Sequence, residues 1–363
     1  MSTPQSFVLS GCIVALGVLP CAVECHGQEL TSEPAQAESR KPLLREYTVE
    51  DWAGVRVSIE RGLSYLKRQQ RAGGIGESYT VATTSLAGLA VLGAGYHPGQ
   101  APYGTMLEGC LRYLRSVASV SGYITEAGKN QSRMHGHCYA VLFLTQLLGT
   151  AQDEAQDLAP LVKAGVQVIA RSQSREGGWW YGETNAKQED EASVTVCALQ
   201  ALRAARNVGV SVDSLVVTNA RNYVRKCQVP DGSFCYRLTT RSRTSFALSV
   251  AALSTLNAAG VYESSELRKG MAYVYKTLAL SPRSPWKVVE EEYPYYGNLY
   301  AAQTLYQDRS SQFDRWYAAV RQYLVNEQQP SGAWKSRYGD AYGTAVALLI
   351  LEVPFGYLPI FQR

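Results

Sequence analysis

The sequence predicts an all-α fold, an (α/α)6 toroid in which six helical hairpins form a double ring. Three observations lead to this prediction: a short motif recurs at six sites, the sites are almost evenly spaced, and each lies between two different kinds of helix. A single hairpin of this kind cannot bury its apolar face alone, so the six units must stack on their neighbours.

The repeated motif is clearest as "QSREGGW" from Gln173, "QVPDGSF" from Gln228 and "QQPSGAW" from Gln328. Its template is Gln, two variable residues, Ser, Asp or Glu, then Gly, any residue, and Trp or Phe. We interpret the Gly as a helix-ending residue with positive φ, the Gln as a partner for free backbone groups, and the ring as a wedge between units. Looser copies begin at Gln70, Ala118 and Leu280, which gives intervals of 48, 55, 55, 52 and 48 residues.

Each copy of the motif follows an amphipathic helix and precedes an apolar one. Residues 55–69, "VRVSIERGLSYLKRQ", carry apolar side chains at helical spacing and Lys and Arg on the other face. Residues 193–205, "SVTVCALQALRAA", are small and apolar, which suits a crowded interior. An open solenoid and a closed ring both accommodate such repeats, but the contrast between the two helices favours a closed ring with the apolar helices inside.

The first 50 residues differ from the repeats. Residues 1–27 are predicted to be an export signal segment, because Phe7–Val23 is apolar and uncharged but short for a membrane span. A buried or disordered N-terminus in a cytosolic protein is the alternative. Residues 28–50 are predicted to be a polar linker and residues 51–363 the toroid. We therefore expect a periplasmic or extracellular protein, with envelope association as a further expectation.

The charge limits the classes of partner that we expect, and the cysteine content limits the possible disulfide bonds. The net charge is +4 and no dense block of Lys and Arg occurs, so nucleic acid is not an expected partner. Five of the eight Cys follow the signal segment, and an odd number cannot pair completely. Cys227 and Cys235 flank the motif copy at Gln228, where a disulfide across the turn and two unpaired core thiols are both open.

The Gln…Gly-x-Trp repeat at this spacing resembles that of terpenoid cyclases and protein prenyltransferase β subunits, whose fold is an α/α toroid. The resemblance runs from about Val55 to the C-terminus. The segments "RMHGHCYAVLFLTQLLG" and "GTAVALLILEVPFGYLPIFQR" further resemble exported planctomycete proteins with prenyltransferase and squalene-cyclase-like repeats. This resemblance implies a fold and leaves the reaction open, because one fold hosts many activities.

In the squalene–hopene cyclases of this family, an Asp-x-Asp-Asp motif at the start of an inner helix protonates the substrate. Glu191 of this chain falls on the first acid, but Ser and Val occupy the paired acid positions. Asp340 falls on the first acid of the last unit, where Tyr and Gly replace the pair. The resemblance therefore does not imply class II cyclisation by that mechanism.

Protein prenyltransferases hold zinc with an Asp, a Cys and a His near inner-helix starts. In "HGHCYA", Cys138 matches the Cys, but Gly136 stands where the Asp belongs. His135 and Cys138 share a helix face and His137 adds a nitrogen donor, so zinc is the alternative to a capped helix start with a buried thiol. No cofactor is predicted, because a third and a fourth ligand are not identified.

Acidic and aromatic residues gather before two inner helices. The cluster Glu189–Glu191 is either a solvated first turn, which favours the positive end of the helix dipole, or a general acid or cation site. Residues 290–300, "EEEYPYYGNLY", suit a sugar or cationic ligand or, alternatively, a loop that packs on its neighbour. The sequence has no Walker loop, nucleophile elbow or His-Glu-x-x-His motif.

The repeat register predicts that the inner helices begin on one face, around the mouth of a cavity. We expect a protein that binds a ligand or partner there, with an isoprenoid or a glycan as the ligand class. The alternative is an enzyme acting on a terpene or a glycan. The catalytic candidates are Glu191, Asp340 and His137, and the candidates for binding at the mouth are Tyr79, His135, Arg243 and Tyr296.

Overall fold

The structure is a computed structural model that describes residues 49–126, 133–150, 155–185, 187–280, 285–286 and 293–361. All of them belong to one unit, Leu43–Arg363. The predicted signal segment and nearly all of the predicted linker lie outside the described residues, as do Glu290–Glu292. The predicted toroid start at residue 51 is close to the first described helix, which begins at Val49.

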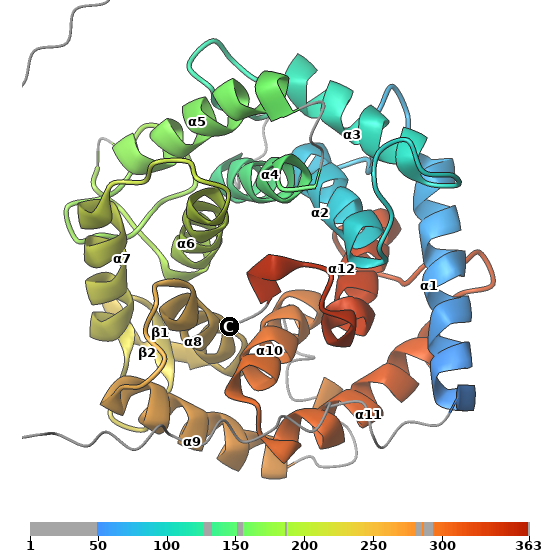
Figure 1. Cartoon of the computed structure of the whole chain (residues 1–363). Coiled ribbons are helices and arrows are strands. Elements are labelled where there is room, and N and C mark those ends of the chain that lie inside the picture. The colour runs from blue at the N-terminus through green and yellow to red at the C-terminus, as the bar shows by residue number, and fades with distance from the viewer. Residues whose placement is uncertain are drawn as a thin grey trace, which may run out of the picture. The chain divides into compact units, whose positions relative to one another are not determined.

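The described part of the chain forms twelve α-helices that alternate between an outer and an inner ring (Figure 1). This arrangement confirms the predicted all-α toroid of hairpins. The outer helices are α1 (Val49–Gln69), α3 (Gly104–Ser116), α5 (Ala155–Arg171), α7 (Ser214–Cys227), α9 (Ser265–Ala279) and α11 (Ser311–Glu327). The inner helices are α2 (Thr80–Gly93), α4 (Arg133–Leu148), α6 (Ala192–Asn207), α8 (Phe246–Ala258), α10 (Pro294–Asp308) and α12 (Asp340–Glu352).

The two rings differ in burial as the sequence predicts. Helix α12 is buried almost throughout, whereas α7 buries a single stripe along its length. Each inner helix packs against the next inner helix, and α12 packs against α2 and α1, which closes the ring. A small antiparallel hairpin of β1 (Phe234–Arg237) and β2 (Thr240–Ser245), which the sequence did not predict, precedes α8. Two short 3-10 helices, η2 (Val353–Phe355) and η3 (Pro359–Phe361), follow α12.

The Gln of the motif clamps one unit to the next. Gln173 Nε2 donates to the carbonyl of Gly177, at 3.0 Å, and to that of Val216 in α7, at 2.9 Å. Gln328 makes the same pair of bonds, and its second acceptor, at 2.8 Å, is Ser58 in α1. The last unit is therefore tied to the first through a side-chain hydrogen bond to a backbone carbonyl within α1.

The Trp of the motif joins the outer helix of its unit to the inner one. Trp334 Nε1 donates to Leu324 of α11 at 2.7 Å, and its backbone N–H donates to Thr344 Oγ1 of α12 at 3.1 Å. In unit one the motif is a residue shorter than its template, so Ile75 occupies the aromatic position. Equivalent backbone bonds join Ile75 to Thr84, Ile124 to His137, Trp179 to Thr195 and Phe234 to Ser249.

Candidate functional site

Glu191 is fully buried at the start of α6 and caps that helix. Its carboxylate accepts the backbone N–H groups of Ser193 and Val194, both at 2.8 Å, and the Ser193 hydroxyl at 2.7 Å. Burial raises the pKa of Glu191 to about 7, although these hydrogen bonds and the guanidinium of Arg237 oppose the shift. The acid group therefore changes charge near neutral pH.

His135, in the first turn of α4, lies beside this acid. Its Nε2 is 3.1 Å from Ser193 Oγ and 3.9 Å from Glu191 Oε1, and its ring stacks on Tyr181 with centroids 5.9 Å apart. Burial lowers the pKa of His135 to about 4, so the ring is neutral at pH 7 and the contact with Glu191 is not an ion pair there. His135 Nδ1 is buried and has no hydrogen-bond partner within the described residues.

Aromatic rings and guanidinium groups lie next to the acid. The Arg237 guanidinium is 4.2 Å from the ring centroid of Trp180, and that of Arg243 is 4.4 Å from the centroid of Tyr236. The hydroxyls of Tyr181 and Tyr236 hydrogen-bond each other, which joins the loop before α6 to the β1–β2 hairpin. The two contacts between a guanidinium group and a ring are cation–π interactions. We call the following residues the arginine cluster: Trp180, Tyr181, Tyr236, Arg237 and Arg243.

A second group of rings lies where α2, α10 and α12 begin. The Tyr338 ring stacks on Tyr293 at 6.3 Å and meets Tyr79 and Tyr342 edge-on at 5.9 and 5.7 Å. The Arg337 guanidinium is 5.0 Å from the ring centroid of Tyr338. We call these residues the tyrosine cluster: Tyr79, Tyr293, Arg337, Tyr338 and Tyr342.

The two remaining candidates near the inner-helix starts have different surroundings. Asp340 pairs with Lys335 at 2.8 Å, and this pair is open to solvent. The Tyr296 ring lies 4.7 Å from the Tyr300 ring, and its hydroxyl is buried without a hydrogen-bond partner in the described part of the chain. Burial raises the pKa of Tyr296, and the negative charge of Glu191 raises it further. The two groups therefore lie within electrostatic reach of each other.

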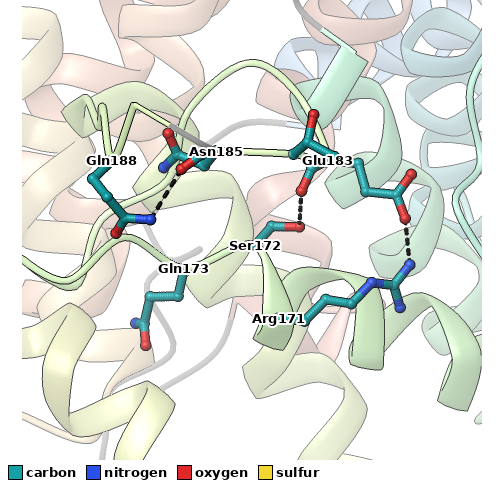
Figure 2. A pocket seen from close by; sticks show the side chains of 7 residues that line it. Arg171, Ser172, Gln173, Glu183, Asn185 and Gln188 are labelled. Carbon is teal, nitrogen blue, oxygen red and sulfur yellow. Dashed lines mark hydrogen bonds and ion pairs between the residues drawn. The ribbon is translucent and has the colours of Figure 1, made fainter.

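A polar pocket of about 390 Å³ lies between the end of α5 and the loop before α6 (Figure 2). Arg171 pairs with Glu183, and Ser172 Oγ donates to the Glu183 carbonyl at 2.8 Å. Gln188 donates to the Asn185 carbonyl at 3.0 Å. The sequence predicted neither this pocket nor a role for Trp180, Tyr181, Tyr236 and Arg237. The run "GGWWYGE" was the available signal for the aromatic pair.

His137 does not lie with the other candidates at the inner-helix starts. It is buried between α4 and α5, where Nδ1 accepts the Ile124 N–H at 3.1 Å and Nε2 donates to the Gly165 carbonyl at 3.0 Å. Its position in the repeat is that of Thr195 and Thr344 in other units. The sequence-based placement of His137 at the mouth was therefore wrong, because its imidazole ring accepts a backbone N–H within its own unit.

The zinc alternative does not fit the donors that the structure describes. Cys138 is buried, and its thiol lies within electrostatic reach of Cys197 on α6. His135 points to Ser193, as above. The described residues contain no group of three His, Cys, Asp or Glu side chains suited to one metal ion. A structural or catalytic zinc site needs at least three protein ligands, so we derive no metal chemistry here.

The repeats, their register and the ring agree with the family comparison. The prenyltransferase alpha-alpha toroid domain matches residues 60–220 and 204–277, which together exceed half of the 363 residues. The chain belongs to the prenyltransferase alpha-alpha toroid family. The expected relation to terpenoid cyclases and prenyltransferases is thereby confirmed, whereas the planctomycete resemblance stays a prediction. The described helices include none long and apolar enough to cross a membrane.

Solved structures with this fold differ in activity. A D-mannose isomerase aligns at 11% identity and a TM-score of 0.58, covering 84% of this chain and 99% of its own. A type II terpene cyclase from Scytonema aligns at 12% and 0.55, covering 86% and 100%. An alpha-amylase from Clostridium perfringens aligns at 10% and 0.52, covering 81% and 97%. Curated proteins give no significant sequence match. Likeness at these identities shows the fold alone.

Proposed function

We propose that this toroid is an exported protein that binds a glycan where α4 and α6 begin. The observation that carries the proposal is the arginine cluster beside the partly buried His135 and the buried Glu191. Half-buried rings of Trp180 and Tyr181 offer flat apolar faces to a sugar ring, while hydroxyl, imidazole and guanidinium groups suit its hydroxyls.

The chemistry of the cluster favours a glycan that carries an acidic group. Arg237 Nε is buried without a hydrogen-bond partner among the described residues, and Arg243 is exposed at the same hairpin. Guanidinium groups bind carboxylate and sulfate with two parallel hydrogen bonds. An acidic substituent on the ligand would satisfy the donor of Arg237 that the protein leaves unpaired.

An isoprenoid ligand has less support from the same residues. An isoprenoid chain offers no hydrogen-bonding groups, so its binding would leave charged and polar groups desolvated and unpaired. The polar pocket at the loop that carries Trp180 and Tyr181 is lined by Arg, Glu, Ser, Thr, Asn and Gln side chains. These groups match a polyhydroxylated ligand better than a hydrocarbon.

A second candidate function is catalysis on the same ligand, with Glu191 as the general acid. It is favoured by the Glu191 pKa of about 7, because a group that titrates near the working pH suits proton transfer. The cap geometry counts against it, since both carboxylate oxygens are engaged by the start of α6. We therefore place binding first.

Calorimetric titration of the purified full chain tests the proposal. The ligands are neutral oligosaccharides, uronic-acid oligosaccharides of equal length and a soluble isoprenoid alcohol. We expect the acidic sugars to bind best, and Trp180→Ala and Arg237→Ala each to weaken binding about tenfold or more, as loss of a stacked ring or a paired guanidinium does. Arg112→Ala, on the exposed face of α3, is the control.

Two results would contradict the glycan proposal. One is binding of the isoprenoid alcohol but of no sugar, and the other is sugar binding that Trp180→Ala and Arg237→Ala leave unchanged. Turnover of a bound sugar that disappears in Glu191→Gln would promote the catalytic candidate. Export is tested separately, by N-terminal sequencing of the chain from fractionated cells. Cleavage between Ala22 and Gln28 is the expected result, and an intact N-terminus in the cytosol is the contrary one.

A further inference from the structure

Cys227 and Cys235 form a pair of buried thiols across the turn of the fourth motif copy. Cys227 is the last residue of α7 and Cys235 lies in β1; both side chains are essentially inaccessible to solvent. The two thiols are close enough to affect each other's ionisation: the pKa of Cys227 is raised and that of Cys235 is lowered. Both residues are free cysteines in this structure.

The backbone brings these two residues next to each other across the turn. Gln228 and Phe234 form an antiparallel bridge, and Val229 N–H donates to the Ser233 carbonyl at 2.9 Å inside it. Cys227 precedes the first residue of this bridge and Cys235 follows the second, and in an antiparallel pair such residues lie opposite each other with Cα atoms roughly 5 Å apart. Disulfides span Cα distances of about 4.4–6.8 Å, so this arrangement is compatible with closure.

We propose that Cys227 and Cys235 form a reversible disulfide that fastens the β1–β2 hairpin to the end of α7. The oxidant is a disulfide of the glutathione class. The Cys235 thiolate attacks one of its sulfurs and releases the first thiol, and the deprotonated Cys227 then attacks Cys235 and releases the second. Two protein thiols are thus oxidised as one external disulfide is reduced to two thiols.

Cys235 is the more acidic of the two thiols. In the closed hairpin the neighbouring Cys227 thiol and the nearby Arg241 hold the pKa of Cys235 below its usual range, whereas the pKa of Cys227 is raised. The folded hairpin covers both sulfurs, so exchange takes place while the hairpin is open, during folding or local unfolding.

The bond would act on the candidate binding site through the hairpin. Cys235 immediately precedes Tyr236 and Arg237, and the same hairpin carries Arg243. Fastening β1 to α7 would restrict these three side chains and lower the entropy that ligand binding must remove. The disulfide itself does not depend on the glycan proposal, because it rests on the two thiols and their turn.

Peptide mapping of the full chain tests the proposal directly. Trypsin releases residues 227–237, "CQVPDGSFCYR", as one peptide that contains both cysteines and no other. The protein is refolded with reduced or oxidised glutathione, denatured, labelled with N-ethylmaleimide without reductant, and digested. We expect the oxidised sample to yield this peptide unlabelled and lacking two hydrogens, and the reduced sample to yield it with two labels.

Matched variants separate the pair from the other buried thiols. Cys110, Cys138 and Cys197 should carry a label in both samples, and Cys110→Ser should leave the 227–237 peptide unchanged. Cys227→Ser and Cys235→Ser should each leave one labelled thiol and abolish the upward shift in melting temperature that oxidation gives to the parent chain. Two labels on the oxidised peptide, or glutathione retained on either cysteine without closure, would overturn the proposal.

Discussion

The arginine cluster and the tyrosine cluster each lie near an acid at the same repeat position, Glu191 and Asp340. The surroundings of the two acids differ. Thr195 Oγ1 donates to the Glu191 carbonyl at 2.8 Å and Thr344 Oγ1 to the Asp340 carbonyl at 2.7 Å, so the two acids are equivalent in the register. Glu191 is wholly buried, whereas the Asp340 side chain is 29% exposed and pairs with Lys335. Repeat position therefore does not set the surroundings of each acid; burial by neighbouring residues does, and it raises the pKa of Glu191.

The difference originates in the segments between motif and inner helix. In unit three the loop brings Trp180 and Tyr181 over the start of α6, and the neighbouring hairpin adds Tyr236 and Arg237. In unit six the corresponding segment is short, and Lys335 reaches Asp340 from the solvent side. The ring thus supplies equivalent positions, and the variable segments give each position its chemistry.

The largest expected effect tests whether the two clusters share one scaffold. Trp179→Ala and Trp334→Ala should each lower the free energy of unfolding by about 3–5 kcal/mol, because each removes a fully buried ring and its hydrogen bond. Urea unfolding measures both. Trp180→Ala, next in sequence but half-buried, is the control with a much smaller loss. Strongly unequal losses at Trp179 and Trp334 would show that the two units are not mechanically equivalent.

Glu191 should contribute a component of the pH dependence of stability that a substitution can isolate. Because the pKa of Glu191 is about 7 when folded and 4.5 ordinarily, the folded chain keeps a proton that the unfolded chain loses between these values. The stabilisation is therefore full below pH 4.5 and falls by roughly 3 kcal/mol as the pH rises to 7. Urea unfolding of Glu191→Gln across this range should lack that component.

His135 and His137 give that experiment a background of the opposite sign. Their pKa values are lowered to about 4, so their stabilisation is lost as the pH falls from 6.5 to 4. The difference between the parent chain and Glu191→Gln removes this shared background. Asp340→Asn is the matched control and should leave the profile unchanged. A parent profile identical to that of Glu191→Gln would remove the basis for treating Glu191 as a titrating group.

The sequence predicted the ring because its signals are local and repeated. The clamp of Gln328 on α1 and the wedge of Trp334 follow from residues that recur with one spacing. The site was predicted only in part, because its environment depends on segments without a repeat. The helix register placed Glu191 near His135, but the hairpin that carries Arg237 has no counterpart in the parts of the other units that the structure describes. His137 was misplaced because its helix face was not resolved by motif spacing.

His137→Thr tests the interpretation that the His137 side chain serves to accept the backbone N–H of Ile124 in its unit. The Thr hydroxyl can accept the Ile124 N–H, as Thr195 and Thr344 do for their own units, but the bond to Gly165 is lost and a small void remains. We expect a loss of about 1–2 kcal/mol in urea unfolding and unchanged ligand affinity. His137→Ala, which also leaves the N–H unpaired, should cost more. A large loss of affinity in a folded His137→Thr variant would restore His137 to the site.

The smallest expected effect concerns the ion pair between Lys335 and Asp340 at the start of α12. Lys335→Ala should leave the free energy of unfolding almost unchanged, because both partners of the Lys335–Asp340 pair are open to solvent and water screens them. Urea unfolding at low and high salt measures the difference. A clear loss of stability that high salt does not reduce would mean that the start of α12 is covered as tightly as the start of α6. The two helix starts would then differ in residue type and not in burial.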